Sequence, residues 1–188
     1  MSPPPSESSY GLLLDMDGVL VDFVGAALRL HGRDEVLDNW PDGVWDMSEV
    51  LGISGREFWY PINQAGAEFW ASLEPYTWCD ELVALADETG GWCILTSPSS
   101  DPSCAAGKIT WLQRRFGGGF RGFLIGPPKW VCARPDQVLV DDNDTNVDHF
   151  RARGGQAILF PRPWNRNHLL SADPMGHVRE ALAEIVAT

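Results

Sequence analysis

Acidic residues occur in pairs at two points of the chain where an apolar run ends. Asp15 and Asp17 follow the run LLL, and Asp141 and Asp142 follow the run VLV. A carboxylate can attack phosphorus as a covalent nucleophile, and a second one can serve as general acid and base. Carboxylates this close together also favour either a bound Mg²⁺ ion or a shared proton. The two pairs therefore indicate a site for a hard cation with oxygen ligands, together with phosphoryl chemistry.

Two hydroxyl residues and two lysines supply complementary groups. Thr96 and Ser97 follow a third apolar run, WCIL, where a hydroxyl and exposed backbone N–H groups can bind phosphate oxygens. The chain has two lysines, Lys108 and Lys129, and Lys129 lies in a proline-marked loop, GPPKW, shortly before the second acidic pair. A cation is needed to hold a phosphoryl group among several carboxylates, and Lys129 is well placed to provide it.

Each fragment also has an ordinary structural explanation when it is taken alone. The DMDG sequence fits an Asx turn after a strand, and the acidic pair fits a helix N-cap, a role that Asp144 could equally fill. Thr96 could cap a turn, and a lysine is ordinarily a solvated surface charge. The functional interpretation depends on finding all of these fragments in one chain, each at the end of a predicted element.

The elements that would position these residues follow from the apolar pattern. Strands are predicted at 11–14, 92–96, 122–125, 138–140 and 156–160. Helices are predicted at 22–30, 80–86, 105–116, 144–151 and 174–186, with Asp80 as the N-cap of the second. Alternating strands and helices imply an α/β fold, with a Rossmann-like, mostly parallel sheet flanked by helices. Ligands bind beyond the carboxyl ends of the strands in such a sheet, which is where the acidic pairs are predicted to lie.

The segment between the first two strands has a different character. Residues 33–74 are rich in aromatic residues, are punctuated by Pro and Gly, and contain no convincing strand, so we interpret them as a small helical insertion. Residues 10–32 and 75–188 then form the core, and the Pro- and Ser-rich residues 1–9 form a flexible tail. Most aromatic residues of the insertion are expected to form its own hydrophobic core.

Composition argues against several classes of protein. The formal net charge of −12 repels polyphosphate, so we expect no binding of long nucleic acid, although a small anionic substrate can bind beside a cation. The four cysteines are widely spaced without a CxxC pair, which favours free thiols over a zinc site or a disulfide framework. The sequence shows no secretory signal and no apolar run of membrane-spanning length. We therefore expect a soluble, cytoplasmic protein without membrane partners.

The ordered motifs resemble those of the haloacid dehalogenase superfamily of phosphatases. That pattern is DxDG after the first strand, Ser or Thr after the second, then Lys, then paired acids after a later strand, and here it spans about residues 11–160. Within it, LLLDMDGVLVDF, ILTSPSS, LVDD and the segment from Lys108 to Gly117 resemble the 5′(3′)-deoxyribonucleotidases, as do FWASLEP and RNHL. Two features depart from that family: a slightly longer segment before Asp141, and the basic, proline-rich loop FPRPWNRNH.

The resemblance implies a role for each acidic residue. Asp15 would be the nucleophile, and Asp17 would be the general acid and base while giving its backbone carbonyl to Mg²⁺. Asp15 and the Asp141–Asp142 pair would supply the carboxylate ligands of that ion, with Asp142 as the direct ligand of the pair.

The resemblance also implies how a substrate would be held. The phosphate would contact Thr96, Ser97 and Lys129, with Lys108 assisting. Phe23 and Trp45 would line a pocket for the nucleotide base, because each matches the position of an aromatic residue in that family. The helical insertion would be a small cap that closes over the site, excludes water and selects the leaving group.

The activity implied is hydrolysis of (deoxy)ribonucleoside 5′-monophosphates through an aspartyl-phosphate. The sequence leaves two alternatives open: the same chemistry on another small phosphate ester, such as a sugar phosphate or modified nucleotide, and a non-catalytic protein that binds nucleotides. It also leaves open the preferred base and the choice between deoxyribose and ribose. The oligomeric state is open as well, and a homodimer is compatible with the sequence.

Overall fold

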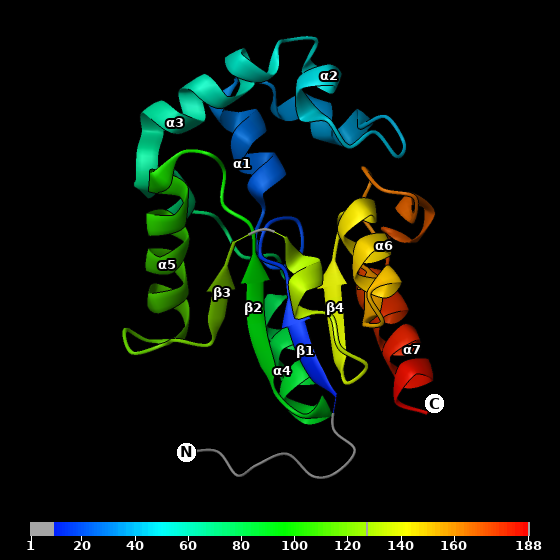
Figure 1. Cartoon of the computed structure of the whole chain (residues 1–188). Coiled ribbons are helices and arrows are strands. Elements are labelled where there is room, and N and C mark those ends of the chain that lie inside the picture. Colours follow the sequence, from blue (N-terminus) through cyan, green and yellow to red (C-terminus); the bar gives the residue numbers. More distant parts are fainter. Residues whose placement is uncertain (1–9, 127, 188) are drawn as a thin grey trace.

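Five parallel strands form one sheet in the computed structural model, which describes residues 10–126 and 128–187. The sheet order is β3-β2-β1-β4-β5 (Figure 1). The strands are β1 (Gly11–Leu14), β2 (Trp92–Thr96), β3 (Phe123–Ile125), β4 (Gln137–Asp141) and β5 (Gln156–Leu159). The predicted α/β fold with a parallel sheet is confirmed. The predicted flexible tail at residues 1–9 lies outside the described residues.

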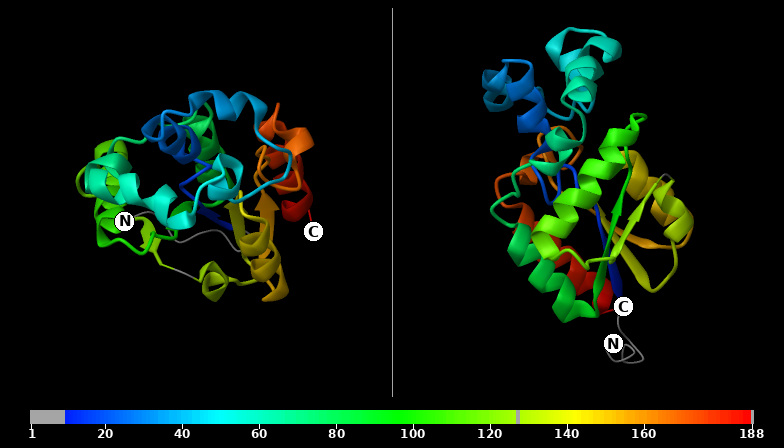
Figure 2. Two further views of the ribbon diagram at one scale, coloured as in Figure 1. Left: turned by 90° about the horizontal axis from the view of Figure 1, so that it is seen from above. Right: turned by 90° about the vertical axis from the view of Figure 1, so that its left-hand side faces the viewer.

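The apolar strands are buried on both faces of the sheet. Successive residues of a strand point to opposite faces, so Leu12 and Leu14 of β1 belong to one hydrophobic cluster and Leu13 belongs to another. The larger cluster includes residues of α4 (Cys79–Thr89) and α7 (Pro174–Val186), and the smaller one includes residues of α6 (Asp144–Ala152). Figure 2 shows α4 and α7 on one side of the sheet and α6 on the other. Coverage of both faces explains why the strands are continuous apolar runs.

Side-chain caps fix where several helices begin. Asp22 caps α1 (Phe23–Leu30) by accepting the backbone N–H of Gly25. The helix α5 (Pro102–Phe116) begins earlier than the prediction because Asp101 caps it and proline is well suited to the first turn.

The prediction that Asp80 caps α4 is wrong. The N-cap residue is Trp78, which makes no side-chain cap hydrogen bond, and Asp80 lies one residue inside the helix, where it pairs with Arg115. A carboxylate in the first turn stabilises a helix through the helix dipole. The acidic residue therefore indicates the start of the helix correctly, although it does not cap it. The helix continues past the predicted end at Ala86 and stops before Gly90.

Residues 33–74 form helices beyond the carboxyl ends of the strands (Figure 1). These helices are η1 (Asp34–Asn39), α2 (Met47–Leu51) and α3 (Gly55–Ala71). Gly66 breaks the path of α3 with a φ of 65°. The last part of α3 packs closely on α5, since a Cβ at Gly107 would lie 2.3 Å from the carbonyl oxygen of Ala67. A side chain at Gly107 would therefore push the two helices apart.

The chain leaves and re-enters the sheet region through two paired segments. Val21 and Pro75 form an isolated antiparallel bridge. The backbone N–H of Asp22 donates to the carbonyl of Glu74 at 2.9 Å, and that of Tyr76 donates to Leu20 at 2.9 Å. The two connections to residues 33–74 therefore lie side by side.

Two further features concern the expectations on membranes and thiols. Within residues 10–126 and 128–187, no helix combines the length and apolar character needed to cross a bilayer. Cys79, Cys93, Cys104 and Cys132 are all free thiols, and Cys79 and Cys104 are buried.

The central strands should dominate the stability of this fold. Leu139 of β4 is fully buried, so Leu139→Ala removes apolar contacts and leaves a cavity. We expect a loss of about 2–5 kcal/mol in the free energy of unfolding, measured by urea denaturation. The control is Leu169→Ala, at a side chain that is 85% exposed, which should change stability by less than about 0.5 kcal/mol. Equal losses in both variants would contradict this assignment of the core.

Candidate active site

The sheet topology brings the two acidic pairs together. β1 and β4 are neighbours, and their register places Leu14 beside Val140, so both strands end at the same level. The strands β2 and β3 lie on one side of β1, and β4 and β5 lie on the other, so the chain order reverses between β1 and β4. Such a switch point is where open α/β sheets form binding crevices.

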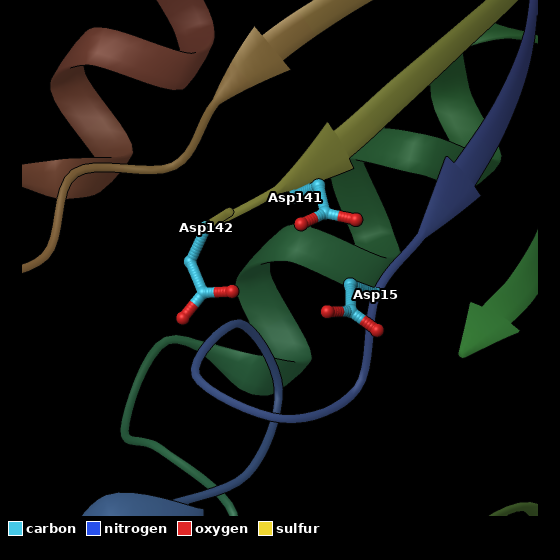
Figure 3. A group of neighbouring side chains, drawn as sticks. All are labelled: Asp15, Asp141 and Asp142. Carbon is cyan, nitrogen blue, oxygen red and sulfur yellow. The ribbon is translucent and has the colours of Figure 1, made fainter. Parts of the chain in front are cut away.

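Three carboxylates converge at this switch point. Asp15 follows β1, while Asp141 ends β4 and Asp142 follows it. Figure 3 shows the three side chains around one space, and one oxygen atom from each lies within 4.8 Å of the others. All three residues are buried. The predicted juxtaposition of the first and last motifs is therefore present.

A buried lysine neutralises part of this acidic cluster. Lys129 Nζ lies 2.6 Å from Asp15 Oδ1 and 2.6 Å from Asp141 Oδ2. Burial opposes the charged form of the ammonium group, but the attraction of Asp141 and Asp15 outweighs it and raises the pKa of Lys129. Lys129 is therefore a permanent cation that joins the ends of β1 and β4.

The two residues of the second acidic pair differ in their surroundings. Asp141 accepts hydrogen bonds from Lys129, from the backbone N–H of Asn143 at 2.8 Å, and from the amide of Asn146 at 3.1 Å. Asp142 accepts the indole N–H of Trp164 at 2.7 Å and lines the pocket described below. Asp141 is thus oriented toward Lys129, whereas Asp142 faces the open part of the site.

The second lysine lies beneath Asp17 and Thr96. Lys108 is fully buried, and its Nζ donates to Asp17 Oδ2 at 2.6 Å, to Thr96 Oγ1 at 2.8 Å and to the carbonyl of Ser97 at 2.8 Å. These three bonds use all three donors of the ammonium group. Lys108 therefore fixes both a carboxylate and a hydroxyl that line the pocket, although Lys108 itself does not line it.

Asp17 has one oxygen free of hydrogen bonds. Its Oδ2 accepts from Lys108, while its Oδ1 is buried and has no partner among the described residues. Desolvation raises the pKa of Asp17, the charge of Lys108 opposes that effect, and the charge of Asp15 adds to it. An acid with a raised pKa and an unpartnered oxygen is suited to proton transfer.

Burial also raises the pKa of both residues of the pair after β4. For Asp141 the attraction of Lys129 opposes the effect of burial. For Asp142 the charges of Asp15 and Asp141 add to burial, and its pKa lies well above the usual range. If Asp15, Asp17, Asp141 and Asp142 were all ionised, their negative charge would exceed the positive charge of Lys108 and Lys129. A divalent cation would offset that excess and so favour the ionised forms.

A pocket of about 350 Å³ opens over these groups. All the predicted site residues except Lys108 and Asp141 line it: Asp15, Asp17, Phe23, Trp45, Thr96, Ser97, Lys129 and Asp142. The carboxylates and hydroxyls come from the segments at the ends of β1, β2 and β4, and the ammonium group comes from Lys129 in the short helix η2 (Lys129–Cys132). The aromatic groups come from α1, from residues 33–74 and from the segment after β5. The pocket can thus hold a phosphate at one end and an apolar or aromatic group at the other.

The two predicted aromatic residues differ in exposure. Trp45 is 47% exposed. Phe23 is buried, with its ring stacked on Trp70 at a centroid distance of 5.2 Å and on Trp59 at 6.0 Å. Trp45 therefore offers an open ring to a ligand, while Phe23 forms part of an aromatic stack whose outer member, Trp59, also lines the pocket.

The sequence interpretation missed several residues that line the pocket: Val24, Trp40, Met47, Trp59, Asn143, Asn146 and Trp164. The asparagines follow the second acidic pair in DDNDTN, so the sequence holds a signal for them. Gly18, the last residue of DMDG, also lines the pocket. It has a φ of 75°, and a Cβ there would lie 1.9 Å from Asp142 Oδ2, so this position also requires glycine for space.

Several solved structures share this fold. A haloacid dehalogenase-like family hydrolase from Xanthomonas campestris matches with a TM-score of 0.58 and 14% identity, covering 97% of both chains. A HAD family hydrolase from Deinococcus radiodurans R1 has a TM-score of 0.56 and 17% identity, covering 96% of this chain and 97% of that one. A HAD hydrolase from Entamoeba histolytica has a TM-score of 0.54 and 15% identity, covering 95% and 100%. The fold is that of the haloacid dehalogenase-like hydrolases.

The sequence places the chain in a family. Residues 9–185 match the family described as 5′ nucleotidase, deoxy (pyrimidine), cytosolic type C protein (NT5C). The chain belongs to this family, which confirms the resemblance drawn from the motifs. A search among curated proteins found no match.

The acidic cluster should make the metal-free protein less stable at neutral pH. An acid whose pKa is raised on folding keeps its proton longer in the native state than in the unfolded chain. Its contribution to stability therefore falls as the pH rises from the unfolded pKa through the folded pKa. Asp142→Asn removes this penalty and keeps an acceptor for Trp164. In EDTA we expect this variant to be more stable than the wild type at neutral pH, with a difference that shrinks in acid.

Urea unfolding in EDTA across a pH series measures this effect. The control is Asp136→Asn, at an exposed carboxylate paired with Arg134 on the surface, which should show no comparable gain. A neutral or destabilising effect of Asp142→Asn at every pH would show that the cluster does not strain the metal-free fold.

Proposed function

We propose that this protein is a Mg²⁺-dependent phosphatase that hydrolyses (deoxy)ribonucleoside 5′-monophosphates through an aspartyl-phosphate at Asp15. The observation that carries the proposal is the grouping of Asp15, Asp17, Thr96 and Lys129 at the base of one pocket, in a chain of the 5′ nucleotidase family. The family supports the substrate class, and the geometry supports the chemistry.

The residues at the switch point fit a magnesium ion. The donors are carboxylate oxygens, which hard divalent cations prefer, and the fully ionised cluster would hold more negative charge than Lys129 and Lys108 balance. Asp15, Asp142 and the backbone carbonyl of Asp17 would hold the ion, and Asp141 would orient Lys129 beside it. When bound, Mg²⁺ would neutralise charge on the phosphoryl oxygens.

The first half of the reaction would transfer the phosphoryl group to Asp15. Because Asp15 Oδ1 accepts from Lys129, the other oxygen would attack phosphorus, forming an O–P bond as the bond to the 5′-oxygen of the nucleoside breaks. Asp17 would donate its proton to that leaving oxygen from Oδ1, the oxygen without a partner. Thr96 and Lys129 would bind the phosphoryl oxygens during this transfer.

The second half would regenerate the enzyme. Asp17, now ionised, would take a proton from a water molecule as that water attacks phosphorus. The bond between phosphorus and Asp15 would break, releasing inorganic phosphate and a free carboxylate. Lys108 holds Asp17 and Thr96 in fixed positions through both halves, and so would act as a positioning residue, not as a direct phosphate ligand.

The aromatic end of the pocket would bind the nucleoside. Trp45 exposes about half of its surface, and Phe23 anchors the stack that includes Trp59. We propose that residues 33–74 act as a cap that brings these rings over the substrate. We further propose a cytoplasmic location, which the family description supports.

A nucleotide panel tests the proposed activity. With Mg²⁺, purified protein should release phosphate from deoxyribonucleoside 5′-monophosphates, measured by a colorimetric phosphate assay. Asp15→Asn should lower kcat by at least about 1,000-fold, because an amide is a poor nucleophile. Asp136→Asn, on the surface, should keep wild-type activity. Turnover of sugar phosphates with none of nucleotides would exclude the proposed substrate, and full activity of Asp15→Asn would exclude the proposed mechanism.

Trp45 should contribute to nucleoside binding. A base stacked on an aromatic ring gains about 1–3 kcal/mol, so Trp45→Ala should raise KM for a nucleotide by about 5- to 150-fold. Deoxyribose 5-phosphate has no base, and its kinetics should be unaffected by the same substitution. Equal KM changes for both substrates would show that Trp45 supports the fold of the pocket and does not contact the base.

A further inference from the structure

The loop FPRPWNRN, residues 160–167, lies against the residue that follows β4. Asn165 is fully buried, and its Nδ2 donates to the backbone carbonyls of Asp142 and Phe160 at 2.8 Å each. Its Oδ1 accepts the backbone N–H of Asn167 at 3.0 Å. One side chain therefore closes the loop on itself and ties it to the backbone of Asp142.

The neighbouring residue of this loop holds the Asp142 side chain. Trp164 is 2% exposed, and its Nε1 lies 2.7 Å from Asp142 Oδ2. A hydrogen bond to a carboxylate in a buried site is stronger than one between neutral groups. Consecutive residues thus fix Asp142 at two points, the backbone through Asn165 and the carboxylate through Trp164.

The indole ring of Trp164 is itself held in place. The guanidinium of Arg162 lies 4.4 Å from its ring centroid, and the edge of Trp40 approaches it at 5.8 Å with an interplanar angle of 68°. A Cβ at Gly18 would lie 3.3 Å from atom Cζ2 of the ring, so the first motif passes close by as well. These contacts hold the ring in the orientation that directs its N–H toward Asp142.

Arg162 is anchored by other groups. It is 8% exposed, stacks on Tyr76 at 4.2 Å, and donates from Nη2 to the Tyr76 hydroxyl at 2.6 Å. That hydroxyl donates to Asp22, the N-cap of α1. The ring of Trp164 is therefore fixed by a network that reaches the connection between the sheet and residues 33–74.

We propose that Trp164 is a positioning residue for divalent-cation binding: its indole N–H orients the carboxylate of Asp142 toward the metal. The inference rests on the proposed function, in which Asp142 is a direct ligand. Loss of a group that hydrogen-bonds to a metal ligand and orients it commonly lowers metal affinity by about 10- to 100-fold. This proposal gives the basic, proline-rich loop at residues 160–167 a role at the active site.

Two replacements of Trp164 test this proposal. Trp164→Phe removes the N–H donor together with part of the ring, and 3-benzothienylalanine at position 164 keeps the ring shape while sulfur replaces the N–H. Isothermal titration with Mg²⁺, and electron paramagnetic resonance of added Mn²⁺, measure the affinity without any turnover. For both replacements we expect the Mg²⁺ Kd to rise by about 10- to 100-fold, with a smaller change in the nucleotide KM at saturating Mg²⁺.

The matched control is Trp111→Phe in α5. Trp111 is buried to a similar extent, and its indole N–H donates to the carbonyl of Leu73 at 2.7 Å, outside the pocket. This variant should lose stability while keeping the wild-type Mg²⁺ affinity. If the benzothienylalanine protein folds and binds Mg²⁺ as tightly as the wild type, the proposal is wrong, whatever happens to Trp164→Phe.

The same data separate this inference from the proposed function. Wild-type protein that binds Mg²⁺ and hydrolyses nucleotides, beside Trp164 variants of unchanged affinity, would overturn the inference and leave the function standing. Loss of Mg²⁺ affinity in those variants, beside wild-type protein inert toward every phosphate ester, would support the inference and overturn the function.

Discussion

The central constraint on this structure is the pairing of two buried lysines with three buried carboxylates and the partly exposed Asp17, at the ends of β1, β2 and β4. Lys129 joins Asp15 to Asp141, and Lys108 joins Asp17 to Thr96. Breaking a buried ion pair from one side leaves an uncompensated charge, which is far more costly than losing a surface pair. Each lysine therefore needs its full set of acceptors, and the strand ends that carry those acceptors must stay in register.

The same charged groups leave the site poised for a ligand. Burial and mutual repulsion raise the pKa values of Asp17, Asp141 and Asp142. Without a bound cation these carboxyl groups therefore favour their protonated, neutral forms. Burial of the apolar strands between helices on both faces of the sheet stabilises the fold and offsets this electrostatic cost. Loss of stability at a preorganised site is a common consequence of selection for function.

The sequence predicts the strand ends well because short apolar runs followed by acids are a local signal. It predicts the fold for the same reason, since alternating strands and helices determine a parallel sheet. It does not predict that Asp80 lies inside α4, because an acidic residue near a helix start can be either the N-cap or a residue of the first turn. It also misses the structural parts played by Lys108, Asn146 and Trp164. Lys108 and Asp17 are 91 positions apart, and Trp164 and Asp142 are 22 apart, so the three-dimensional fold alone creates these two contacts.

The central claim is that Asp15 carries the phosphoryl group during turnover. Rapid mixing of the protein with a deoxyribonucleoside 5′-monophosphate and Mg²⁺, followed by quenching and borohydride reduction, converts an aspartyl-phosphate into homoserine. Peptide mass spectrometry then locates it. The account predicts homoserine at position 15, dependent on both substrate and Mg²⁺. Homoserine at another aspartate, or its absence in a protein that is turning over substrate, would contradict it.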